Sequence, residues 1–451
     1  MDVDGAIQTF SVARLSAIPP IEFHPFASQM RTSAHHSGEK ETVMKNPKRL
    51  GLAFLASVTV VCAYFNAMYS PFLFEDIQVY LASAQRVLDG ISIYQTPVMV
   101  DANGSFPDGL YFIYPPFAAL VFIPFLLFGH FAILMFTILG VLALWRTIYL
   151  LLVAAKLFNQ NVLRMSIVAT VALVPLEPFI TNISSGNINF YIVWLIAESF
   201  FSLKTWAPLH LGVASAIKFT SAIYALLHLI VRPLQSSLKL IAMFLIALLV
   251  GFIADPESTV EYFTKYVFGV SRVPSNLSGS GNQSILGILN RAGLASESLS
   301  IVWLLSASVL VVVALLLASK WWNNSEIFWP LALVTVVSLL VSPLSWTHHY
   351  VAYVFVFIAS ITSSWRPKIA HGFSIITYVF FLSTVHVTRF ILDQISAVAG
   401  EPITSIVSAC LTNKYLVINC IFLTLCLWRF IDEYAGSRAE KSSVPQTLHS
   451  D

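Results

Sequence analysis

The chain has 451 residues, of which 57% are hydrophobic and 11% are charged, and its mean hydropathy is +0.77. Soluble domains carry about 25% charged residues, so a soluble domain of any size is excluded here. The net charge of +2 is too close to zero to indicate a nucleic-acid partner. The composition therefore predicts an all-α integral membrane protein, a polytopic helical bundle embedded in a lipid bilayer.

Residues 1–49 are mostly polar and contain no long apolar run. This composition predicts a disordered cytoplasmic tail and not a cleaved signal peptide. A sharper hypothesis is that Met44 is the native start, because the sequence from Met44 onward reads as a signal anchor. Tryptic peptides from residues 1–31 in the native protein would contradict that start.

A hydrocarbon core about 30 Å thick needs about 20 apolar residues per helix. This length predicts a transmembrane bundle over residues 50–432 with about twelve spans, and a cytoplasmic tail over residues 433–451. The predicted spans lie near residues 50–70, 115–129, 131–155, 164–181, 187–203, 207–231, 238–254, 299–319, 326–342, 349–364, 369–388 and 413–431.

Basic residues near the ends of spans predict the orientation. Lys45, Lys48 and Arg49 precede the first span and place the N-terminus in the cytoplasm. Segments 71–114 and 255–298 then become external loops, which predicts a plasma-membrane protein with its functional face outside. Alternation of the spans places further basic residues in the cytoplasm, with Lys156 and Arg164 as exceptions; the residues that agree are Arg232, Lys239, Lys320, Arg366, Lys368, Arg429, Arg438 and Lys441.

The first external loop begins with an amphipathic pattern. Residues 76–88 have helical apolar spacing, which predicts a helix lying in the membrane interface. Asp76 stands at its start and can be an N-cap, or a general base toward a hydroxyl at the rim of the bundle. The neighbouring Glu75 can play either part. Tyr114 precedes a Pro-Pro break before the second span and is expected to line the site in a mostly structural role.

Polar residues also interrupt the apolar segments further along the chain. Asn187 and Asn189 belong to the sequence NISSGNIN, which is either a solvated turn or the polar lining of a cavity. Lys218 is a lone cation near the middle of the predicted span 207–231. Because a charge within a membrane is costly, Lys218 is expected to be functional, with a phosphate or a carboxylate as its partner.

The second external loop contains the sequence NQSILGILNR. This stretch is either a flexible loop or a short helix over residues 283–291. In the second case Asn282, Gln283 and Arg291 aim two amides and a guanidinium at a phosphate or a sugar.

The sequence SPLSWTHHY lies between the ninth and tenth predicted spans. His348 and His349 are adjacent and would point about 100° apart on a helix, so the binding of one metal ion by both is geometrically poor. The pair follows Trp346 on the same predicted face as Asp76. At least one of the two is expected to be a hydrogen-bond donor at the membrane interface, and the pair beside Trp346 is a candidate seat for a lipid phosphate and a sugar ring.

Six sequence blocks within residues 75–350 together resemble the polyprenol-phosphate-mannose-dependent α-mannosyltransferases of glycosyltransferase family 87, which have the GT-C fold. The blocks are EDIQVY…VLDGISIY, YPPFAAL, SSGNIN, ASAIKFTSA, NQSILGILNR and LVSPLSWTHHY. The resemblance implies that Asp76 is the catalytic base and that His348 or His349 lies near the donor phosphate. The chain departs from the family at Asn187, where Gln is common, at Thr220, where Pro is common, and at Thr347, where Asp is common.

The resemblance also implies the reaction. A lipid carrying a β-linked mannosyl phosphate would donate its sugar to a glycolipid or lipoglycan of the cell envelope. Phosphate is a good leaving group, so one carboxylate suffices for an inverting displacement, whereas glycoside hydrolysis needs two. Lys218, Arg291 and a histidine would stabilise the departing phosphate. The first loop has no DxD pair and the chain has no Gly-rich nucleotide loop, so neither an obligate metal nor a cofactor is expected.

A secondary transporter or a lipid flippase would have the same composition and span count. Such proteins tend to show internal repeats with broken helices at matched positions, and no repeat is evident in this sequence. The two long polar external loops also favour the transferase. A structural or adaptor role is a third and more distant hypothesis.

Overall fold

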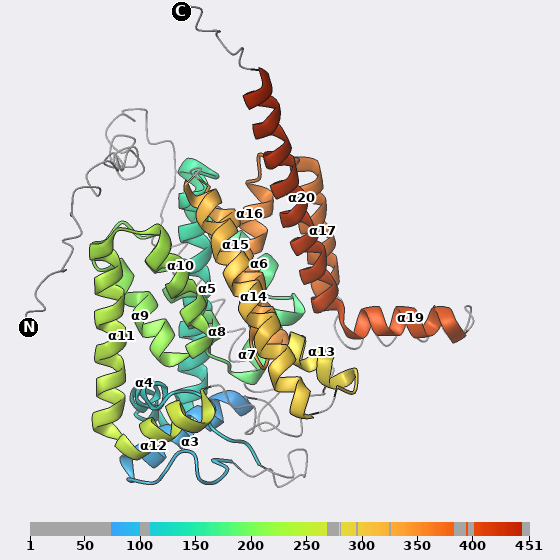
Figure 1. Cartoon of the computed structure of the whole chain (residues 1–451). Helices are drawn as coiled ribbons and strands as arrows, with labels where there is room; N and C mark the ends of the chain where they lie inside the picture. Colours follow the sequence, from blue (N-terminus) through green and yellow to red (C-terminus); the bar gives the residue numbers. More distant parts are fainter. Residues whose placement is uncertain are drawn as a thin grey trace, which may run out of the picture. The chain divides into compact units, whose positions relative to one another are not determined.

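The computed structural model describes residues 74–99, 109–267, 279, 281–294, 296–323, 326–382, 394–395 and 401–443. Within these ranges the secondary structure is helical (Figure 1), apart from one isolated β-bridge between Met99 and Leu110. The prediction of an all-α protein is therefore confirmed. The predicted N-terminal tail, the first span and the last residues of the C-terminal tail lie outside the described residues.

The helices, in chain order, are α3 (Glu75–Leu88), α4 (Pro116–Leu126), η1 (Gly129–Phe131), α5 (Ala132–Ala154), η2 (Asn159–Asn161), α6 (Val162–Leu173), α7 (Glu177–Ser185), α8 (Asn189–Phe201), α9 (Ala207–Ile217), η3 (Phe219–Ser221), α10 (Ala222–Val231), α11 (Leu234–Ala254), α12 (Pro256–Glu261), η4 (Tyr262–Tyr266), α13 (Ile285–Arg291), α14 (Ser296–Asn323), α15 (Phe328–Val341), η6 (Thr347–Tyr353), α16 (Val354–Ile361), α17 (Pro367–Leu382), α19 (Glu401–Thr412) and α20 (Lys414–Ser443).

Four of the described helical segments are long and apolar enough to cross a bilayer: Gly129–Ala154, Leu234–Ala254, Ser298–Asn323 and Lys414–Gly436. A fifth candidate is the pair α6 and α7, which bends by 81°. Pro175 explains the bend, because proline has no N–H for the helical ladder and clashes with the preceding turn. Together with shorter apolar helices, these segments make the chain a membrane protein.

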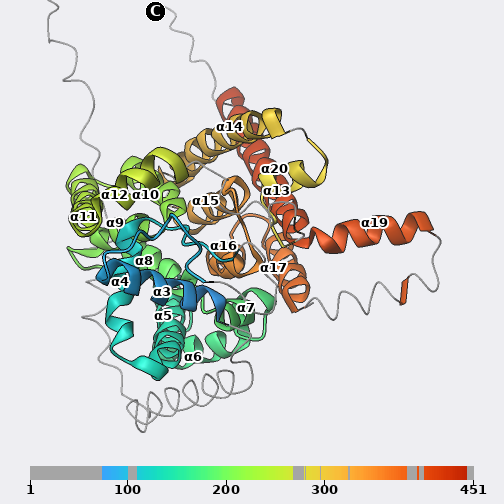
Figure 2. The same ribbon diagram turned by 90° about the horizontal axis from the view of Figure 1, so that it is seen from below.

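The amphipathic helix predicted at residues 76–88 is α3. Ile77, Tyr80 and Ala84 are buried on one of its faces, whereas Leu88 at its end is 57% exposed. Tyr80 stacks on Phe122 of α4, with ring centroids 4.5 Å apart. In Figure 2, α3 and α4 lie next to each other at the end of the bundle seen from below.

The predicted span 115–129 does not cross the bundle. Its helix α4 has 11 residues, a length of about 16 Å, and contains Pro124. Phe122 packs beside α3, and Phe125 packs on Phe136 in the first turn and a half of α5, with centroids 5.4 Å apart. The start of α4 lies beside the end of α11, since a Cβ at Gly251 would lie 3.1 Å from the backbone nitrogen of Phe117. Both ends of α4 therefore lie on the face that carries α3.

The predicted span 207–231 is a re-entrant hairpin and not a crossing. After α10, Arg232 donates a 2.7 Å hydrogen bond to the carbonyl of Phe200 at the end of α8. Early in α11, Lys239 donates a 2.8 Å hydrogen bond to the carbonyl of Thr205, just before α9. The start of α9 and the end of α10 therefore lie on the same face.

The packing of α9 fixes the direction of this hairpin. A Cβ at Gly212 of α9 would lie 2.6 Å from the carbonyl oxygen of Leu240 in α11, so the two backbones touch and the helices run in the same direction. The chain leaves the helical conformation at Lys218, with φ −135° and ψ 102°, and returns as η3 and α10. Lys218 therefore lies at the tip of the hairpin, inside the bundle.

When segments 115–129 and 207–231 are no longer counted as crossings, Lys156 and Arg164 cease to be exceptions to the distribution of basic residues. The helices α5 and α8 run in the same direction, because Tyr191 bonds the carbonyl of Phe136 at 2.6 Å and Arg146 pairs with Glu198 at 2.8 Å. Lys156, after α5, therefore lies on the face where α8 ends. Contacts among the ends of α8, α10, α14, α17 and α20 place Arg232, Lys320, Arg366 and Arg429 on that same face.

Candidate functional site

Asp76 lies in the first turn of α3, on the face opposite the basic residues. The N-cap of this helix is Phe74, and no side chain caps it, so the N-cap interpretation of Asp76 is wrong. The Oδ2 atom of Asp76 instead accepts a 2.9 Å hydrogen bond from Nδ2 of Asn187. A carboxylate that is not used for capping is available for chemistry.

The turn between α7 and α8 fixes Asn187 against α3. Gly186 has φ +65°, a left-handed conformation that glycine adopts without strain. A Cβ at Gly186 would lie 2.5 Å from Cγ2 of Ile77, so only glycine allows the turn to touch α3. The N–H of Phe74 also bonds the carbonyl of Ser184 at 2.7 Å. Asn187 and Asn189 are 3% and 5% exposed, so the solvated-turn alternative is wrong, and Asn189 lines a cavity beside the cluster.

Lys218 brings a cation to this cluster from the tip of the hairpin. Its Nζ donates a 2.7 Å hydrogen bond to Oδ1 of Asn189 and lies 3.2 Å from Nε2 of His349. Its ammonium also lies 5.6 Å from the centre of the Tyr114 ring. The direct partners of Lys218 are therefore neutral groups, and the carboxylate of Asp76 is the opposite charge that acts on it.

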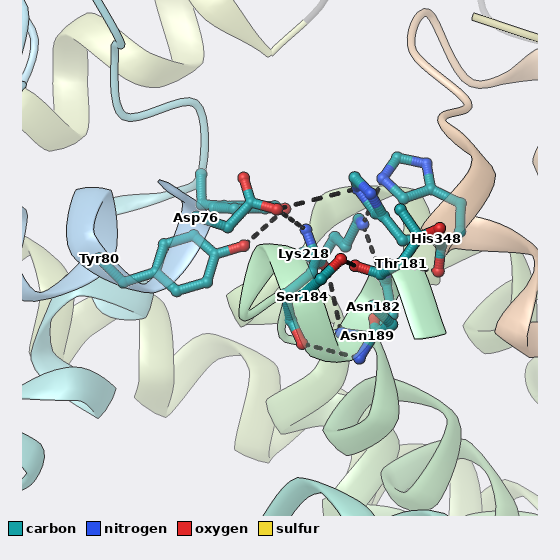
Figure 3. Close-up of polar contacts among 11 residues, drawn as sticks. Asp76, Tyr80, Thr181, Asn182, Ser184, Asn189, Lys218 and His348 are labelled. Carbon is teal, nitrogen blue, oxygen red and sulfur yellow. Dashed lines mark hydrogen bonds and ion pairs between the residues drawn. The ribbon is translucent and has the colours of Figure 1, made fainter. Parts of the chain in front are cut away.

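The two histidines face different partners. Nε2 of His348 lies 4.0 Å from Oδ2 of Asp76, whereas Nε2 of His349 faces Lys218. Their rings are 4.8 Å apart and inclined by 75°, in line with the divergence expected from adjacent residues. Figure 3 shows Asp76, Lys218 and His348 directed toward one another from three separate parts of the fold.

The environment of Asp76 tunes its proton affinity. Burial raises the pKa of Asp76 from 3.8 to about 6, while the hydrogen bond from Asn187 and the charge of Lys218 act in the opposite direction. The side chain still keeps 33% of its surface exposed, so an incoming molecule can reach it. A carboxylate with a pKa this close to neutrality is suited to act as a general base.

Two tyrosines border the carboxylate. The hydroxyls of Tyr80 and Tyr114 are 3.4 Å apart, and burial raises the pKa of both phenols, so they stay neutral. Tyr94 fixes the backbone by donating a hydrogen bond to the carbonyl of Tyr114. Sequence analysis missed Tyr80 as a site residue. Its spacing of four residues from Asp76 was the available signal, because residues i and i+4 share a helix face.

A cavity of about 50 Å³ adjoins the inner side of this cluster. Asn189, Lys218 and His349 line it, together with apolar side chains of α8 and the hydroxyl-bearing residues Thr220 and Ser342. Within the described ranges, no three His, Cys, Asp or Glu side chains converge as metal ligands do.

The structure places three predicted site residues elsewhere. Asn282, Gln283 and Arg291 form a second polar cluster around the segment that leads to Trp346. The guanidinium of Arg291 donates to the carbonyls of Gly279 and Asn282 at 2.9 and 2.8 Å, so this segment already occupies it. Of the two alternatives for residues 283–291, the short helix is confirmed as α13 (Ile285–Arg291). Glu75 is a half-buried neighbour of Asp76 in α3.

Within a membrane bundle, a carboxylate with a raised pKa thus lies near a buried cation and two imidazoles. Such a site is suited to transfer a group from a phosphate-bearing lipid to an alcohol. The chain matches the model of glycosyltransferase family 87 over residues 112–343, just over half its length. It therefore belongs to glycosyltransferase family 87 and is an enzyme. The matched range includes Asn187 and Lys218; the structure adds Asp76 and the histidines to them.

Several relatives are similar over most of the chain. Identity is 27% over 320 residues, 65% of this chain and 71% of the relative, to the polyprenol-phosphate-mannose-dependent alpha-(1-2)-phosphatidylinositol mannoside mannosyltransferase of Mycolicibacterium smegmatis. The protein of the same name from Mycobacterium tuberculosis is 30% identical over 61% of this chain and 67% of its own length. A polyprenol-phosphate-mannose-dependent alpha-(1-2)-phosphatidylinositol pentamannoside mannosyltransferase of Mycobacterium tuberculosis is 27% identical over 77% of this chain and 78% of its own. No solved structure shows significant similarity.

Proposed function

We propose that this enzyme transfers mannose from a polyprenyl-phosphate-mannose donor to a hydroxyl of a cell-envelope glycolipid or lipoglycan, with inversion at the anomeric carbon. The names of the relatives support both the donor and a phosphatidylinositol mannoside as the acceptor class. The observation that carries the proposal is the position of Asp76, whose Oδ2 lies 4.0 Å from His348 and near Lys218. One acidic group and several basic groups thus share one site.

Asp76 is the general base. As the acceptor oxygen bonds to the anomeric carbon, its proton passes to the carboxylate, and the bond between that carbon and the phosphate oxygen breaks. Asn187 donates to Oδ2 at 2.9 Å and so fixes the carboxylate while the proton moves. The pKa of about 6 leaves the group charged at neutral pH but basic enough to accept the proton.

Lys218, His348 and His349 receive the donor phosphate. The phosphate leaves with the bonding electrons, and the ammonium of Lys218 at the buried end of the site stabilises the charge that develops. Lys218 is already held by Asn189 at 2.7 Å and by His349 at 3.2 Å, so the cation is oriented before the substrate arrives. Because phosphate is a good leaving group, this scheme needs no separate acid.

The site would face the outside of the cell. It lies at the end of the bundle opposite the face where the basic residues gather, and such residues mark the cytoplasmic side of membrane proteins. An external site suits an acceptor of the cell envelope and a lipid-linked donor. We further propose that the bundle is of the GT-C type, with about twelve apolar segments that include one re-entrant hairpin.

The proposal is tested with membranes from cells that express the chain. They are incubated with radiolabelled polyprenyl-phosphate-mannose, and the extracted lipids are separated. We expect a labelled glycolipid whose mannose is released by an α-mannosidase, and we expect none from membranes with the Asp76→Asn variant. Label that reaches lipid only from a nucleotide-linked mannose, or a β-linked product, would overturn the proposed donor or stereochemistry.

A further inference from the structure

The NQS sequence of the second loop is bonded to the segment that precedes the histidines. Asn282 is fully buried, and its Oδ1 accepts hydrogen bonds from the N–H groups of Ser345 at 3.0 Å and Ser284 at 3.3 Å. Its Nδ2 donates to the carbonyl of Pro343 at 3.1 Å. The N–H of Gln283 donates to the carbonyl of Ser345 at 2.9 Å. One carboxamide therefore holds residues 343–345 from both sides of Leu344.

Leu344 in turn bonds His349. The imidazole of His349 lies within reach of the Leu344 backbone, while its Nε2 faces the ammonium of Lys218 at 3.2 Å. An ammonium can only donate, so Nε2 must accept. The other ring nitrogen then carries the proton and donates to the carbonyl of Leu344. The position of Leu344 thus selects the tautomer of His349 and the direction of its ring.

The described segment 281–291 is closely packed against its surroundings. A Cβ at Gly281 would lie 2.9 Å from the ring of Trp346, and a Cβ at Gly287 would lie 2.6 Å from the carbonyl oxygen of Asn282. Arg291 bonds the carbonyl of Asn282 at 2.8 Å and Oδ1 of Asn413, before α20, at 2.8 Å. The backbone that carries Asn282 is therefore fixed by contacts with Trp346 and Arg291.

We propose that Asn282 is a positioning residue. Through the carbonyl of Leu344 it holds His349 in the orientation in which Nε2 fixes the ammonium of Lys218, the group that meets the phosphate of a lipid-linked sugar. The inference rests on the proposed function, because it takes His349 as part of the phosphate site. It differs from a direct contact between Asn282 and the donor, since all polar atoms of that side chain bond residues of the chain itself.

The test compares Asn282→Ala with Asn282→Asp and with the control Asn323→Ala, which changes an exposed asparagine at the far end of α14. Displacement of a catalytic group by about 1 Å costs about 100-fold in rate. We expect Asn282→Ala to lower kcat/KM for the donor about 100-fold with an unchanged KM for the acceptor. Asn282→Asp keeps the oxygen that accepts two N–H bonds, so it should recover part of this loss, and the control should match the wild type.

A double-mutant cycle with His349→Ala separates positioning from a loss of fold. If Asn282 acts through His349, then Asn282→Ala costs little further activity in the His349→Ala background. If the double variant lost kcat/KM by the product of the two single-variant factors, the inference would be overturned. A wild-type kcat/KM for the donor in Asn282→Ala would also overturn it. If His349→Ala alone kept full activity while Asp76→Asn had none, the assignment of His349 would fail and the inference with it. If no variant or wild-type membrane transferred mannose, the proposed function itself would fail.

Discussion

Replacement of Asp76 by Asn is the sharpest test of the site, because it removes the charge with almost no change of shape. An asparagine cannot accept the proton of the acceptor hydroxyl at neutral pH. General-base catalysis by one group contributes about 100- to 10,000-fold. We therefore expect kcat to fall by about that factor, with little change in KM for the donor, whose phosphate we propose to lie at Lys218 and the histidines.

The thermal stability of Asp76→Asn should not fall together with its activity. Burial raises the pKa of Asp76 from 3.8 to about 6, so the charged carboxylate destabilises the folded protein above pH 6, and this cost disappears below about pH 4. The shift corresponds to at most about 3 kcal/mol, and to less than that because 33% of the side chain faces solvent. At pH 7.5 the variant should thus unfold at the same temperature as the wild type or at a higher one.

The assay measures label transfer and thermal unfolding on the same purified protein. Asp89→Asn is the matched control, because it removes an exposed carboxylate at the end of the same helix, and it should keep both properties. Near-wild-type turnover in Asp76→Asn would refute the general-base role. A lowered unfolding temperature together with lost activity would instead indicate a structural role for the carboxylate.

Four further outcomes are expected. The rate of the wild type should rise with pH through about 6 and then level off, because the base must be deprotonated; a flat profile from pH 5 to 8 would contradict this. Lys218→Met should raise KM for the donor at least about 10-fold and leave the acceptor KM unchanged, as measured by initial rates. Gly186→Ala should cost about 1–3 kcal/mol of stability and much of the activity, since its Cβ meets Ile77 at 2.5 Å; denaturant unfolding checks this. Cysteines placed singly at Lys204 and Leu234 should react with an impermeant maleimide from the same membrane face, whereas a crossing would separate them.

Sequence predicted the membrane class, the positions of most helices and several of the polar residues that the structure brings together around Asp76. An amphipathic helix at 76–88 follows from spacing alone, and a lone lysine in an apolar segment is a candidate functional residue because its burial is costly. The short helix after Ser284 was one of two alternatives that the sequence left open, and the structure adds the reason that it forms: the Ser284 hydroxyl accepts a hydrogen bond from the N–H of Gly287. These features depend on residues a few positions apart.

Tertiary structure alone decided whether an apolar segment crosses the bundle. Hydropathy measures how apolar a segment is and has no direction, so a hairpin over residues 207–231 and a straight span give the same signal. The hydrogen bond from Asn187 to Asp76 joins residues 111 positions apart, and the contact of Lys218 with His349 joins residues 131 apart. Packing of whole helices creates such pairs, and it also turned Arg291 toward backbone carbonyls and away from the cluster around Asp76.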